Sequence, residues 1–285
     1  MLIGAHVSVA RGLIAALDYA QSTGAECLQF FAKSPRQWRG PAVDPTLAGA
    51  FIERRRLRGF GPAFTHTAYL INLGSDDAEL FERSVAALAD ELVRCSLLGA
   101  DGVVTHLGNV PLGDSDAAAA RIANGIVRAY DIAGAAGADA RLLLENTAGA
   151  GRSFGSTFEQ LGACISATGL SADRLGVCLD TCHAFAFGMP VDSAEGWNDV
   201  LTALDNACGI ERLGLVHAND CMFERGSKRD RHAWIADGLI GEQGFRAMLC
   251  RPELRDVPAC LEMPGEVPLK DSTNIERLKH YRSEC

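Results

Sequence analysis

Histidines and carboxylates recur at the ends of short apolar runs in this 285-residue chain. Six runs carry one such residue each, namely His66, His106, Glu145, Asp180, His217 and Glu262. Burying three carboxylates without a counter-charge would cost several kcal/mol each, and nearby histidines would relieve that cost only in part. Metal ions would relieve it. A set of His and carboxylate ligands without thiolate suits Zn²⁺, with Mn²⁺ and Fe²⁺ as close alternatives.

Two neighbouring segments extend this set of candidate ligands. His183 follows Asp180 by three residues, and Asp230 and His232 alternate in a loop, so that in an extended chain both point the same way. The resulting nine ligands are too many for one ion and enough for two or three, with a carboxylate shared by a pair. Ions about 4 Å apart can hold the attacking and leaving oxygens of a displacement at phosphorus. The pattern therefore favours hydrolysis of a phosphate ester.

The chain alternates between β-rich and helix-like stretches. Eight short apolar runs lie at residues 2–8, 27–32, 63–67, 102–107, 141–147, 175–180, 213–218 and 259–263, and stretches such as 78–98, 117–136 and 158–167 have helical composition. Eight strand–helix units predict one closed (β/α)8 barrel, a TIM barrel forming a single domain over residues 1–285, with the polar strand ends at one mouth. The alternative is an open doubly wound sheet, but no GxGxxG follows the first run and no composition break marks a second domain.

Composition narrows the class of protein. The chain is 48% hydrophobic and 22% charged, which excludes a disordered protein. No apolar run approaches the length of a membrane span and the N-terminus lacks a signal-peptide pattern, so we expect a cytoplasmic protein without membrane contact. The ten cysteines are scattered through apolar runs and are predicted to be core side chains rather than disulfides. The net charge of −9 argues against non-specific coating of nucleic acid, unless bound cations or basic patches change the local field.

Several longer motifs resemble those of one known family. They are Gly4-Ala5-His6-Val7-Ser8, Arg36-Gln37-Trp38, Tyr69-Leu70-Ile71-Asn72-Leu73, Glu145-Asn146-Thr147-Ala148-Gly149, the run CLDTCHAF at 178–185, and Asp230-Arg231-His232. On these motifs the chain closely resembles the endonuclease IV family, the zinc-dependent apurinic/apyrimidinic endonucleases of base-excision repair, over essentially its whole length. The resemblance implies a xylose-isomerase-like TIM barrel that holds three zinc ions.

The resemblance also implies a role for each candidate ligand. One zinc ion would be held by His66, His106 and Glu145, a second by Glu145, Asp180, His217 and Glu262, and the third by His183, Asp230 and His232. The implied reaction is hydrolysis of the phosphodiester 5′ to an abasic site in duplex DNA by a metal-activated hydroxide. It leaves a 3′-hydroxyl and a 5′-deoxyribose phosphate. The implied catalytic residues are Glu145, which organises the bridge, and Glu262, which could orient the nucleophile.

DNA contacts are expected from a wedge and from two basic loops. In the family a loop Arg and a Tyr-Leu pair enter the minor groove of a kinked duplex, and the matching residues are Arg36, Tyr69 and Leu70. Phosphate contacts are expected from Lys33, Arg36 and Arg39 in one loop and from Arg225, Lys228, Arg229 and Arg231 in another. Three zinc ions would add six charges to −9, giving −3, so overall acidity does not exclude DNA binding by a monomer.

The chain departs from the family pattern at two places. Cys221-Met222 stands where the family usually has Ser-Lys, and Ala236 stands where it usually has Gly, which puts loop conformation, DNA affinity and rate in question. His6 is expected to support the ligands without binding metal, and His280 is expected at the surface. Two alternative functions stay open: a metal-dependent sugar isomerase or epimerase on the same barrel, and a non-catalytic protein that binds damaged DNA and has structural zinc.

Overall fold

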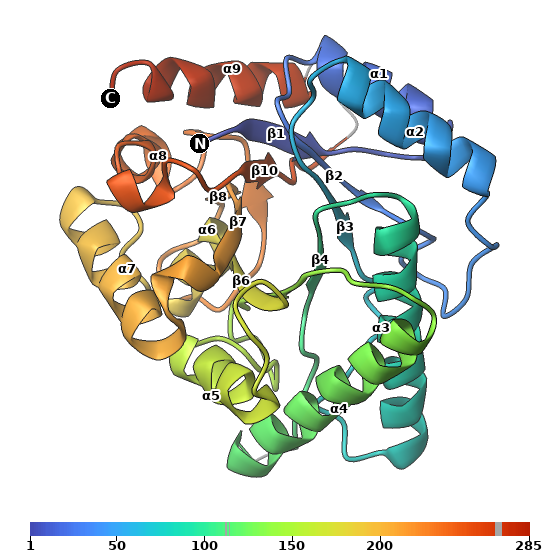
Figure 1. Ribbon diagram of the computed structural model, residues 1–285. Coiled ribbons are helices and arrows are strands. Elements are labelled where there is room, and N and C mark those ends of the chain that lie inside the picture. Colours follow the sequence, from blue (N-terminus) through green and yellow to red (C-terminus); the bar gives the residue numbers. More distant parts are fainter. Residues whose placement is uncertain (112, 114, 266–269) are drawn as a thin grey trace.

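Parallel strands close into a barrel in the computed structural model, which describes residues 1–111, 113, 115–265 and 270–285 (Figure 1). In this part of the chain eight strands form the barrel: β1 (Ile3–His6), β2 (Leu28–Phe31), β3 (Ala63–His66), β4 (Gly102–Thr105), β5 (Leu142–Glu145), β6 (Leu175–Asp180), β7 (Leu213–His217) and β10 (Ala259–Leu261). Their order around the barrel is β1-β10-β7-β6-β5-β4-β3-β2, so strands adjacent in sequence pair and the last pairs with the first. The eight predicted strands and the TIM barrel are confirmed.

Helices form a ring outside these strands (Figure 1). They are α1 (Leu13–Ser22), α2 (Pro45–Leu57), α3 (Ala78–Leu97), α4 (Ser115–Ala135), α5 (Phe158–Thr168), α7 (Ala194–Cys208), α8 (Gly241–Leu249) and α9 (Lys270–Arg282), with short 3₁₀ turns at Ile210–Arg212 and Pro252–Leu254. The short helix α6 (Thr181–Phe187) directly follows β6 and lies against β8, inside this ring. A two-stranded antiparallel sheet, β8 (Asp220–Cys221) with β9 (His232–Ala233), lies in the long connection after β7. None of the described helices combines the length and the apolar character needed to cross a bilayer.

The core has two layers because each strand buries both of its faces. Outside the strands, side chains such as Phe30 of β2 pack against the helices, and the Phe30 ring meets that of Phe51 in α2 edge-on at 5.8 Å. Inside the barrel a smaller cluster fills the space: Cys27, Phe64, Val104, Leu143, Cys178, Leu215 and Cys260. The interior of the barrel is therefore apolar, and the polar strand ends form a separate layer at its mouth.

The cysteine prediction is right for most of the thiols and wrong for two. Eight cysteines are free and buried, as expected of small core side chains. Cys250 and Cys285 instead form a disulfide, with a Cα–Cα distance of 5.1 Å. They lie 35 residues apart in sequence, directly after α8 and at the end of the chain, and they meet because α8 and α9 pack side by side. No sequence spacing signals such a pairing, since the packing of two helices creates it.

Glu26 links α9 to β1 through hydrogen bonds, and its carboxylate makes the free energy of unfolding depend on pH. The Glu26 carboxylate accepts hydrogen bonds from Arg282 (2.7 and 3.0 Å) and from the Ile3 amide (2.9 Å). Burial opposes the charge, but these partners lower the Glu26 pKa from 4.5 to about 2. Because the folded-state pKa is the lower one, the stabilisation is complete above about pH 4.5 and is lost as the pH falls towards 2.

We expect Glu26→Gln to lower the free energy of unfolding by roughly 1 to 2 kcal/mol at pH 7, after allowance for solvent screening. The difference from the unchanged protein should shrink steadily between pH 4.5 and pH 3, in urea titrations of chelator-treated protein. Glu53→Gln, which removes an exposed partner of Arg56, is the matched control and should change stability far less. A Glu26→Gln deficit that stays constant from pH 7 to pH 3 would contradict this account.

Candidate metal centre

Parallel strands point their carboxyl ends at one face, and this face carries six of the nine predicted ligands. Strands β3, β5, β6 and β7 end on His66, Glu145, Asp180 and His217, while His106 directly follows β4 and Glu262 directly follows β10. All of these strands belong to one closed barrel, so the six side chains surround a common space.

Local structure brings the other three ligands to the same place. Helix α6 begins directly after β6, and Asp180 caps it by accepting a hydrogen bond from the His183 amide (2.7 Å), which turns His183 back over the mouth. His232 lies in β9, opposite Cys221 of β8. The buried carboxylate of Asp220 accepts hydrogen bonds from the amides of Cys221 (2.8 Å) and Ile240 (2.9 Å), so it holds both ends of the loop that carries Asp230 and His232.

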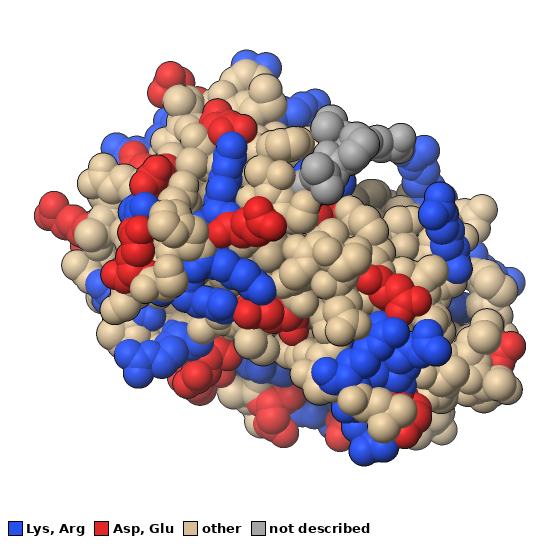
Figure 2. Space-filling model, turned by 90° about the horizontal axis from the view of Figure 1, so that it is seen from above, with Lys and Arg blue, Asp and Glu red and all other residues tan. Residues whose placement is uncertain are grey.

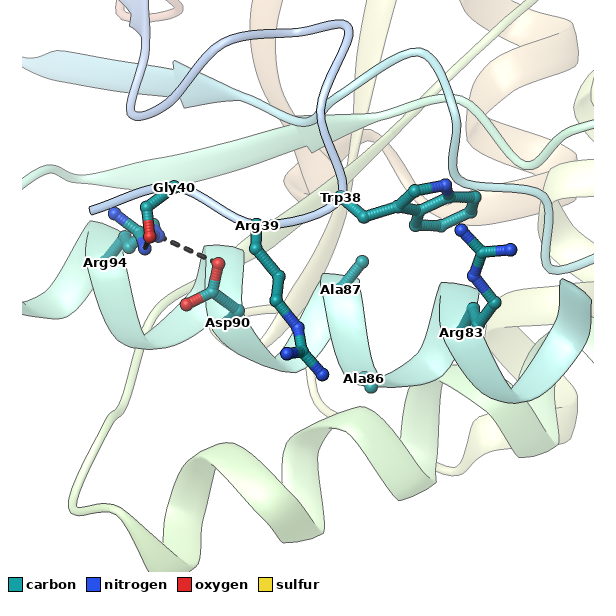
Figure 3. A pocket seen from close by; sticks show the side chains of 8 residues that line it. All are labelled: Trp38, Arg39, Gly40, Arg83, Ala86, Ala87, Asp90 and Arg94. Carbon is teal, nitrogen blue, oxygen red and sulfur yellow. Dashed lines mark hydrogen bonds and ion pairs between the residues drawn. The ribbon is translucent and has the colours of Figure 1, made fainter. Parts of the chain in front are cut away.

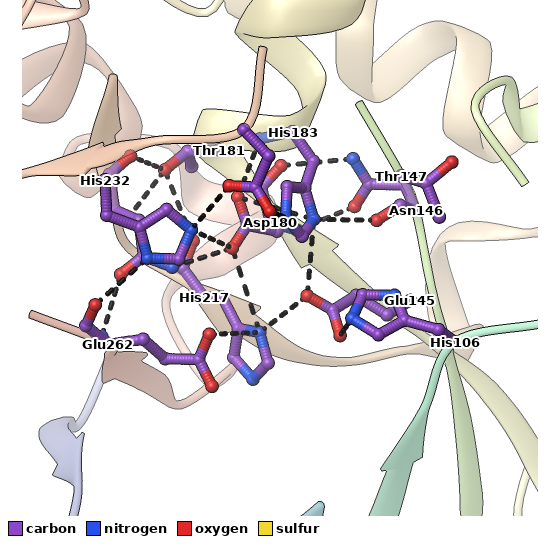
Figure 4. A network of polar contacts seen from close by, with 12 residues as sticks. His106, Glu145, Asn146, Thr147, Asp180, Thr181, His183, His217, His232 and Glu262 are labelled. Atoms are coloured by element: carbon purple, nitrogen blue, oxygen red, sulfur yellow. Dashed lines mark hydrogen bonds and ion pairs between the residues drawn. The ribbon is translucent and has the colours of Figure 1, made fainter. Parts of the chain in front are cut away.

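Glu145 connects two groups of candidate ligands, and its two oxygens face different neighbours (Figure 4). Oε2 lies 3.1 Å from His66 Nε2 and 3.3 Å from His106 Nε2. Oε1 lies 2.9 Å from His217 Nδ1 and 3.4 Å from His183 Nδ1. One carboxylate therefore offers an oxygen to each of two groups of ligands, as a bridging ligand must.

The remaining ligands form a third group at the outer side of the mouth. His183 Nε2 lies 3.2 Å from Asp230 Oδ2, and His232 Nε2 lies 3.3 Å from Asp230 Oδ1. The Asp230 side chain is 50% exposed, whereas the Glu145 side chain is 1% exposed. The third group is thus the part of the cluster most open to a ligand from solvent.

The donor sets fit divalent cations. Within the described residues, ligand atoms lie within 4.8 Å of one another in the groups His66-His106-Glu145, Glu145-Asp180-His217-Glu262 and His183-Asp230-His232. A further group, Asp180-Cys182-His232, shares members with these. His232 Nε2 is buried, and within the described residues its contact with Asp230 at 3.3 Å is an ion pair without hydrogen-bond geometry, so a cation between the two groups would satisfy both. Imidazole and carboxylate ligands suit Zn²⁺ and its first-row neighbours.

The pKa values of the candidate ligands are shifted because the buried carboxylates and histidines lie close enough to stabilise each other's charged forms. Burial opposes the charge of Glu145, yet its pKa lies well below the usual value because His106 and His217 are close. Burial also opposes the charged form of His183, but Asp180, Asp230 and Glu145 raise its pKa far above the usual value. Burial dominates at Asp180, whose pKa is raised. Cations entering these groups would compete with protons on the imidazoles, which couples metal affinity to pH.

In three histidines a backbone carbonyl accepts a hydrogen bond from Nδ1, which leaves Nε2 as the nitrogen that can bind a cation. His66 Nδ1 donates to the Thr67 carbonyl (2.9 Å), His183 Nδ1 to that of Asn146 (2.9 Å) and His232 Nδ1 to that of Glu262 (3.0 Å). Carbonyl oxygens only accept, so each of these Nδ1 atoms carries the proton and each Nε2 is left for a ligand. The Nε2 atoms point towards the carboxylates of Glu145 and Asp230, and no spacing in the sequence shows this orientation.

Sequence reasoning missed three buried amides that support the ligands. Asn146 accepts a hydrogen bond from the Asp180 amide (2.7 Å), and Asn219 Nδ2 donates to Asp180 Oδ2 (2.7 Å). Gln29 contacts His6, His217 and Glu262 from β2. The signal for Gln29 was present, because it is the polar residue within the apolar run 27–32. His6 contacts a candidate ligand, because its Nδ1 lies 3.2 Å from Glu262 Oε1.

A cavity of about 480 Å³ leads from the surface to the third group. Its lining includes Tyr69, Leu70, His106, His183 and Asp230. Tyr69 is 65% exposed, and its ring stands against those of Phe31 (5.5 Å) and His66 (6.1 Å). The predicted wedge residues Tyr69 and Leu70 therefore form one wall of the space that opens onto the candidate ligands.

Comparisons with known proteins place the chain in a family. A family model described as xylose isomerase-like TIM barrel matches residues 17–282. A protein of Methanoculleus marisnigri named probable endonuclease 4 is 43% identical over 280 residues, covering 98% of each chain. The crystal structure of endonuclease IV from Thermus thermophilus has a TM-score of 0.88 and 39% identity, with 100% of both chains covered. The chain belongs to the endonuclease 4 family.

Membership of the endonuclease 4 family confirms the resemblance that the motifs indicated, and with it the class of enzyme, a nuclease. Other barrels share the architecture without sharing the sequence. A D-tagatose 3-epimerase-like protein has a TM-score of 0.75 at 19% identity, covering 100% of this chain and 98% of that chain, which shows a common fold alone.

The first basic loop of this endonuclease 4 family member presents Arg36 and Arg39 but not Lys33. Arg36 and Arg39 are exposed, and Arg39 extends beside α3 in a cavity of about 660 Å³ that Trp38 and Arg83 also line (Figure 3). Lys33 is buried, and its Nζ lies 2.8 Å from Asp90 and 2.9 Å from Glu91 in α3. The structure therefore corrects the prediction for Lys33, because its ammonium is buried and already paired with two carboxylates.

The second basic loop stays at the surface as expected. Arg225, Lys228, Arg229 and Arg231 are all exposed. Arg225 pairs with Asp192 at 3.3 Å, and the Arg229 guanidinium lies over the Phe223 ring at 3.4 Å. On the face shown in Figure 2, Lys and Arg side chains are interspersed with Asp and Glu, so local groups of cations exist on an acidic protein. His280 is also exposed, as predicted.

The two departures from the family pattern leave the ligands in place. The Cys221 side chain is buried beside β9, and Met222 is 58% exposed. Ala236 has φ of 66°, the left-handed conformation that glycine adopts without strain. The backbone at Ala236 therefore adopts a conformation that is typical of glycine.

We expect Ala236→Gly to raise the free energy of unfolding by about 1 kcal/mol, because it removes the clash of Cβ with the backbone in the left-handed region. Thermal and urea unfolding of the two proteins would measure the gain. Ala203→Gly, inside α7, is the control and should have the opposite sign, since glycine weakens a helix interior by about the same amount. A loss of stability in both variants would show that Ala236 is unstrained.

Proposed function

We propose that this chain hydrolyses the phosphodiester 5′ to abasic sites in duplex DNA, leaving a 3′-hydroxyl and a 5′-deoxyribose phosphate, with three zinc ions bound at the barrel mouth. The observation that carries the proposal is the position of Glu145, whose two oxygens face separate groups of ligands 2.9 to 3.3 Å away. A centre that shares one carboxylate between two cations suits displacement at a phosphate. The names of the relatives, endonuclease 4, support the same substrate class.

Different residues would bind the cations, orient the nucleophile and contact the DNA. His66, His106 and Glu145 would hold one cation, Glu145, Asp180, His217 and Glu262 a second, and His183, Asp230 and His232 a third. Divalent cations held there would supply Lewis acidity to the phosphate and lower the pKa of a water. Glu262, whose Oε1 is held by Gln29, has Oε2 directed at His217 (3.7 Å), where it can orient the nucleophile. Tyr69 and Leu70 would fill the space left by the missing base, and exposed Arg36 would support the kinked strand.

The proposal also covers how the molecule works as a unit. All nine candidate ligands come from one chain, so we propose that residues 1–285 act as a single domain and as a monomer. Phosphate contacts are proposed for Arg36 and Arg39 in the first loop and for Arg225, Lys228, Arg229 and Arg231 in the second. We place the enzyme in the cytoplasm, because its proposed substrate is duplex DNA and because eight cysteines are free against one disulfide, Cys250–Cys285, within the described residues.

Metal content per chain together with incision of a defined abasic duplex tests the proposed function. We expect about three zinc equivalents per chain and cleavage on the 5′ side of the lesion, with Mn²⁺ or Fe²⁺ in place of zinc at some sites of protein taken from cells. Isomerisation of free ketoses with no incision would instead favour a sugar isomerase or epimerase. Tight binding of the duplex without turnover in the presence of zinc would favour a damaged-DNA-binding protein with structural zinc.

We expect Tyr69→Ala to keep its metal and to weaken binding to an abasic duplex about tenfold, because one exposed aromatic ring that stacks against DNA contributes roughly 1 to 3 kcal/mol. Fluorescence anisotropy with abasic and intact duplexes measures the change, and elemental analysis measures the metal. Leu57→Ala is the control, since Leu57 is 70% exposed on α2. If Tyr69→Ala and Leu57→Ala bound the abasic duplex equally well, Tyr69 would have no place in the wedge.

A further inference from the structure

Gln29 is a polar side chain inside an apolar strand, and it contacts no solvent. It is 0% exposed, and its neighbours in β2 are Leu28, also 0% exposed, and Phe30, which packs outward on α2. Side chains alternate across a strand, so Gln29 points into the barrel beneath the metal centre. A buried amide without partners would be costly, so its contacts are the key to its role.

The Gln29 amide reaches three residues of the mouth. Its Nε2 lies 2.8 Å from Glu262 Oε1 and 2.9 Å from His6 Nδ1, and its Oε1 lies 2.8 Å from His217 Nε2. These residues belong to or adjoin β10, β1 and β7, which lie together on one side of the barrel. The Gln29 amide is therefore bonded to two candidate ligands, Glu262 and His217, and to their neighbour His6.

The chemistry of these groups fixes the orientation of the amide. A carboxylate only accepts hydrogen bonds, so the NH₂ end of Gln29 must face Glu262, and the carbonyl end must face His217. Because that carbonyl also only accepts, His217 Nε2 must carry a proton. Nδ1 faces Glu145 Oε1 (2.9 Å) and Asp180 Oδ2 (3.9 Å), and it donates to Glu145 Oε1 as long as no cation is bound. A cation that displaces this proton would find its lone pair on Nδ1, because Gln29 keeps the other proton on Nε2.

His217 differs in this respect from three other histidines of the proposed centre. His66, His183 and His232 donate from Nδ1 to backbone carbonyls and turn Nε2 towards a carboxylate of the cluster. His217 presents the opposite nitrogen, and a side-chain amide takes the place of the carbonyl. We propose that Gln29 is a positioning residue that holds His217 in the Nε2-protonated tautomer and fixes Glu262 Oε1, so that His217 Nδ1 and Glu262 Oε2 are both presented to one cation. This inference rests on the proposed metal centre, and it names how two of its ligands are prepared.

The test is a pair of measurements on Gln29→Met, which keeps the length of the side chain and removes both hydrogen-bonding ends. Zn²⁺ titration against a chromophoric chelator should show one equivalent per chain bound about 10 to 100 times more weakly, with the other equivalents unchanged. Imidazole ¹⁵N NMR of the zinc-loaded protein should show a single Nε2-protonated state of His217 in the unchanged protein and loss of that single state in the variant. Gln160→Met is the matched control, because Gln160 caps a loop through the Gly155 and Ser156 amides, and it should change neither readout.

Equal zinc affinity together with an unchanged His217 spectrum in Gln29→Met would overturn the proposal. If Gln29→Met does not fold, Gln29→Glu decides: it retains an acceptor for His217, so the Nε2 proton should persist, while the contact with Glu262 becomes repulsive and zinc affinity falls. A proton on Nδ1 in the zinc-loaded Gln29→Glu protein would overturn the proposal equally. Failure of the unchanged protein to incise abasic DNA would instead overturn the proposed function, and the zinc and NMR readouts would still be interpretable.

Discussion

Glu145→Ala is expected to lose bound metal and DNA incision together. Glu145 contributes an oxygen to each of two groups of ligands, so its removal leaves His66 and His106 without a carboxylate and takes one ligand from the group of His217. Lewis-acid stabilisation of a phosphate displacement is worth several kcal/mol. Because each 1.36 kcal/mol is tenfold in rate, we expect incision to fall by about 10³-fold or more.

The measurements are zinc equivalents per chain and the rate of incision under single-turnover conditions. Asp271→Asn is the matched control, since Asp271 is a buried carboxylate on α9 whose partner is the Tyr19 hydroxyl (2.7 Å). That control should keep its zinc and its incision rate. Normal incision by Glu145→Ala would defeat the proposed mechanism, whatever happened to the metal content.

Lys33→Met is expected to have the largest effect on stability. The Lys33 and Glu91 side chains are each 1% exposed and lie 2.9 Å apart, so removing the ammonium leaves a carboxylate buried without its partner. Breaking a buried ion pair from one side costs about 3 to 5 kcal/mol. Burial already raises the pKa of Glu91, so the variant should recover part of the loss at lower pH, as Glu91 takes up a proton.

Arg36→Met separates this structural role from a role in DNA binding. Arg36 is exposed, so its replacement should change stability by less than about 0.5 kcal/mol and should reduce the salt dependence of DNA binding by about one phosphate contact. Adding Glu91→Leu to Lys33→Met should restore much of the lost stability, because the unpaired charge is gone. If Lys33→Met had normal stability and a weaker salt dependence of DNA binding, the structural role of Lys33 would be wrong and Lys33 would be a DNA contact.

Much of the fold was predictable because it is repetitive. Eight apolar runs separated by helical stretches fit one architecture, and the helices predicted at 78–98, 117–136 and 158–167 correspond to α3, α4 and α5. The candidate ligands were predictable for the same reason, since a polar residue at the end of a buried strand is exceptional and is easily noticed. Gln29 escaped notice because it lies within a strand that ends on Phe31, so the strand-end criterion passed over it.

The amino-acid sequence by itself determined the chemical types of the candidate ligands and the face on which they meet. Those depend on residue type and on the lengths of strands and helices, which are local properties of the chain. Only the tertiary structure decided which oxygen of Glu145 faces which histidine and which nitrogen of His217 faces Glu145. It also decided that Lys33 forms a buried ion pair with Glu91. The reason is that barrel closure brings together side chains from distant strands, and hydrogen bonds across that closure have no counterpart in the spacing along the chain.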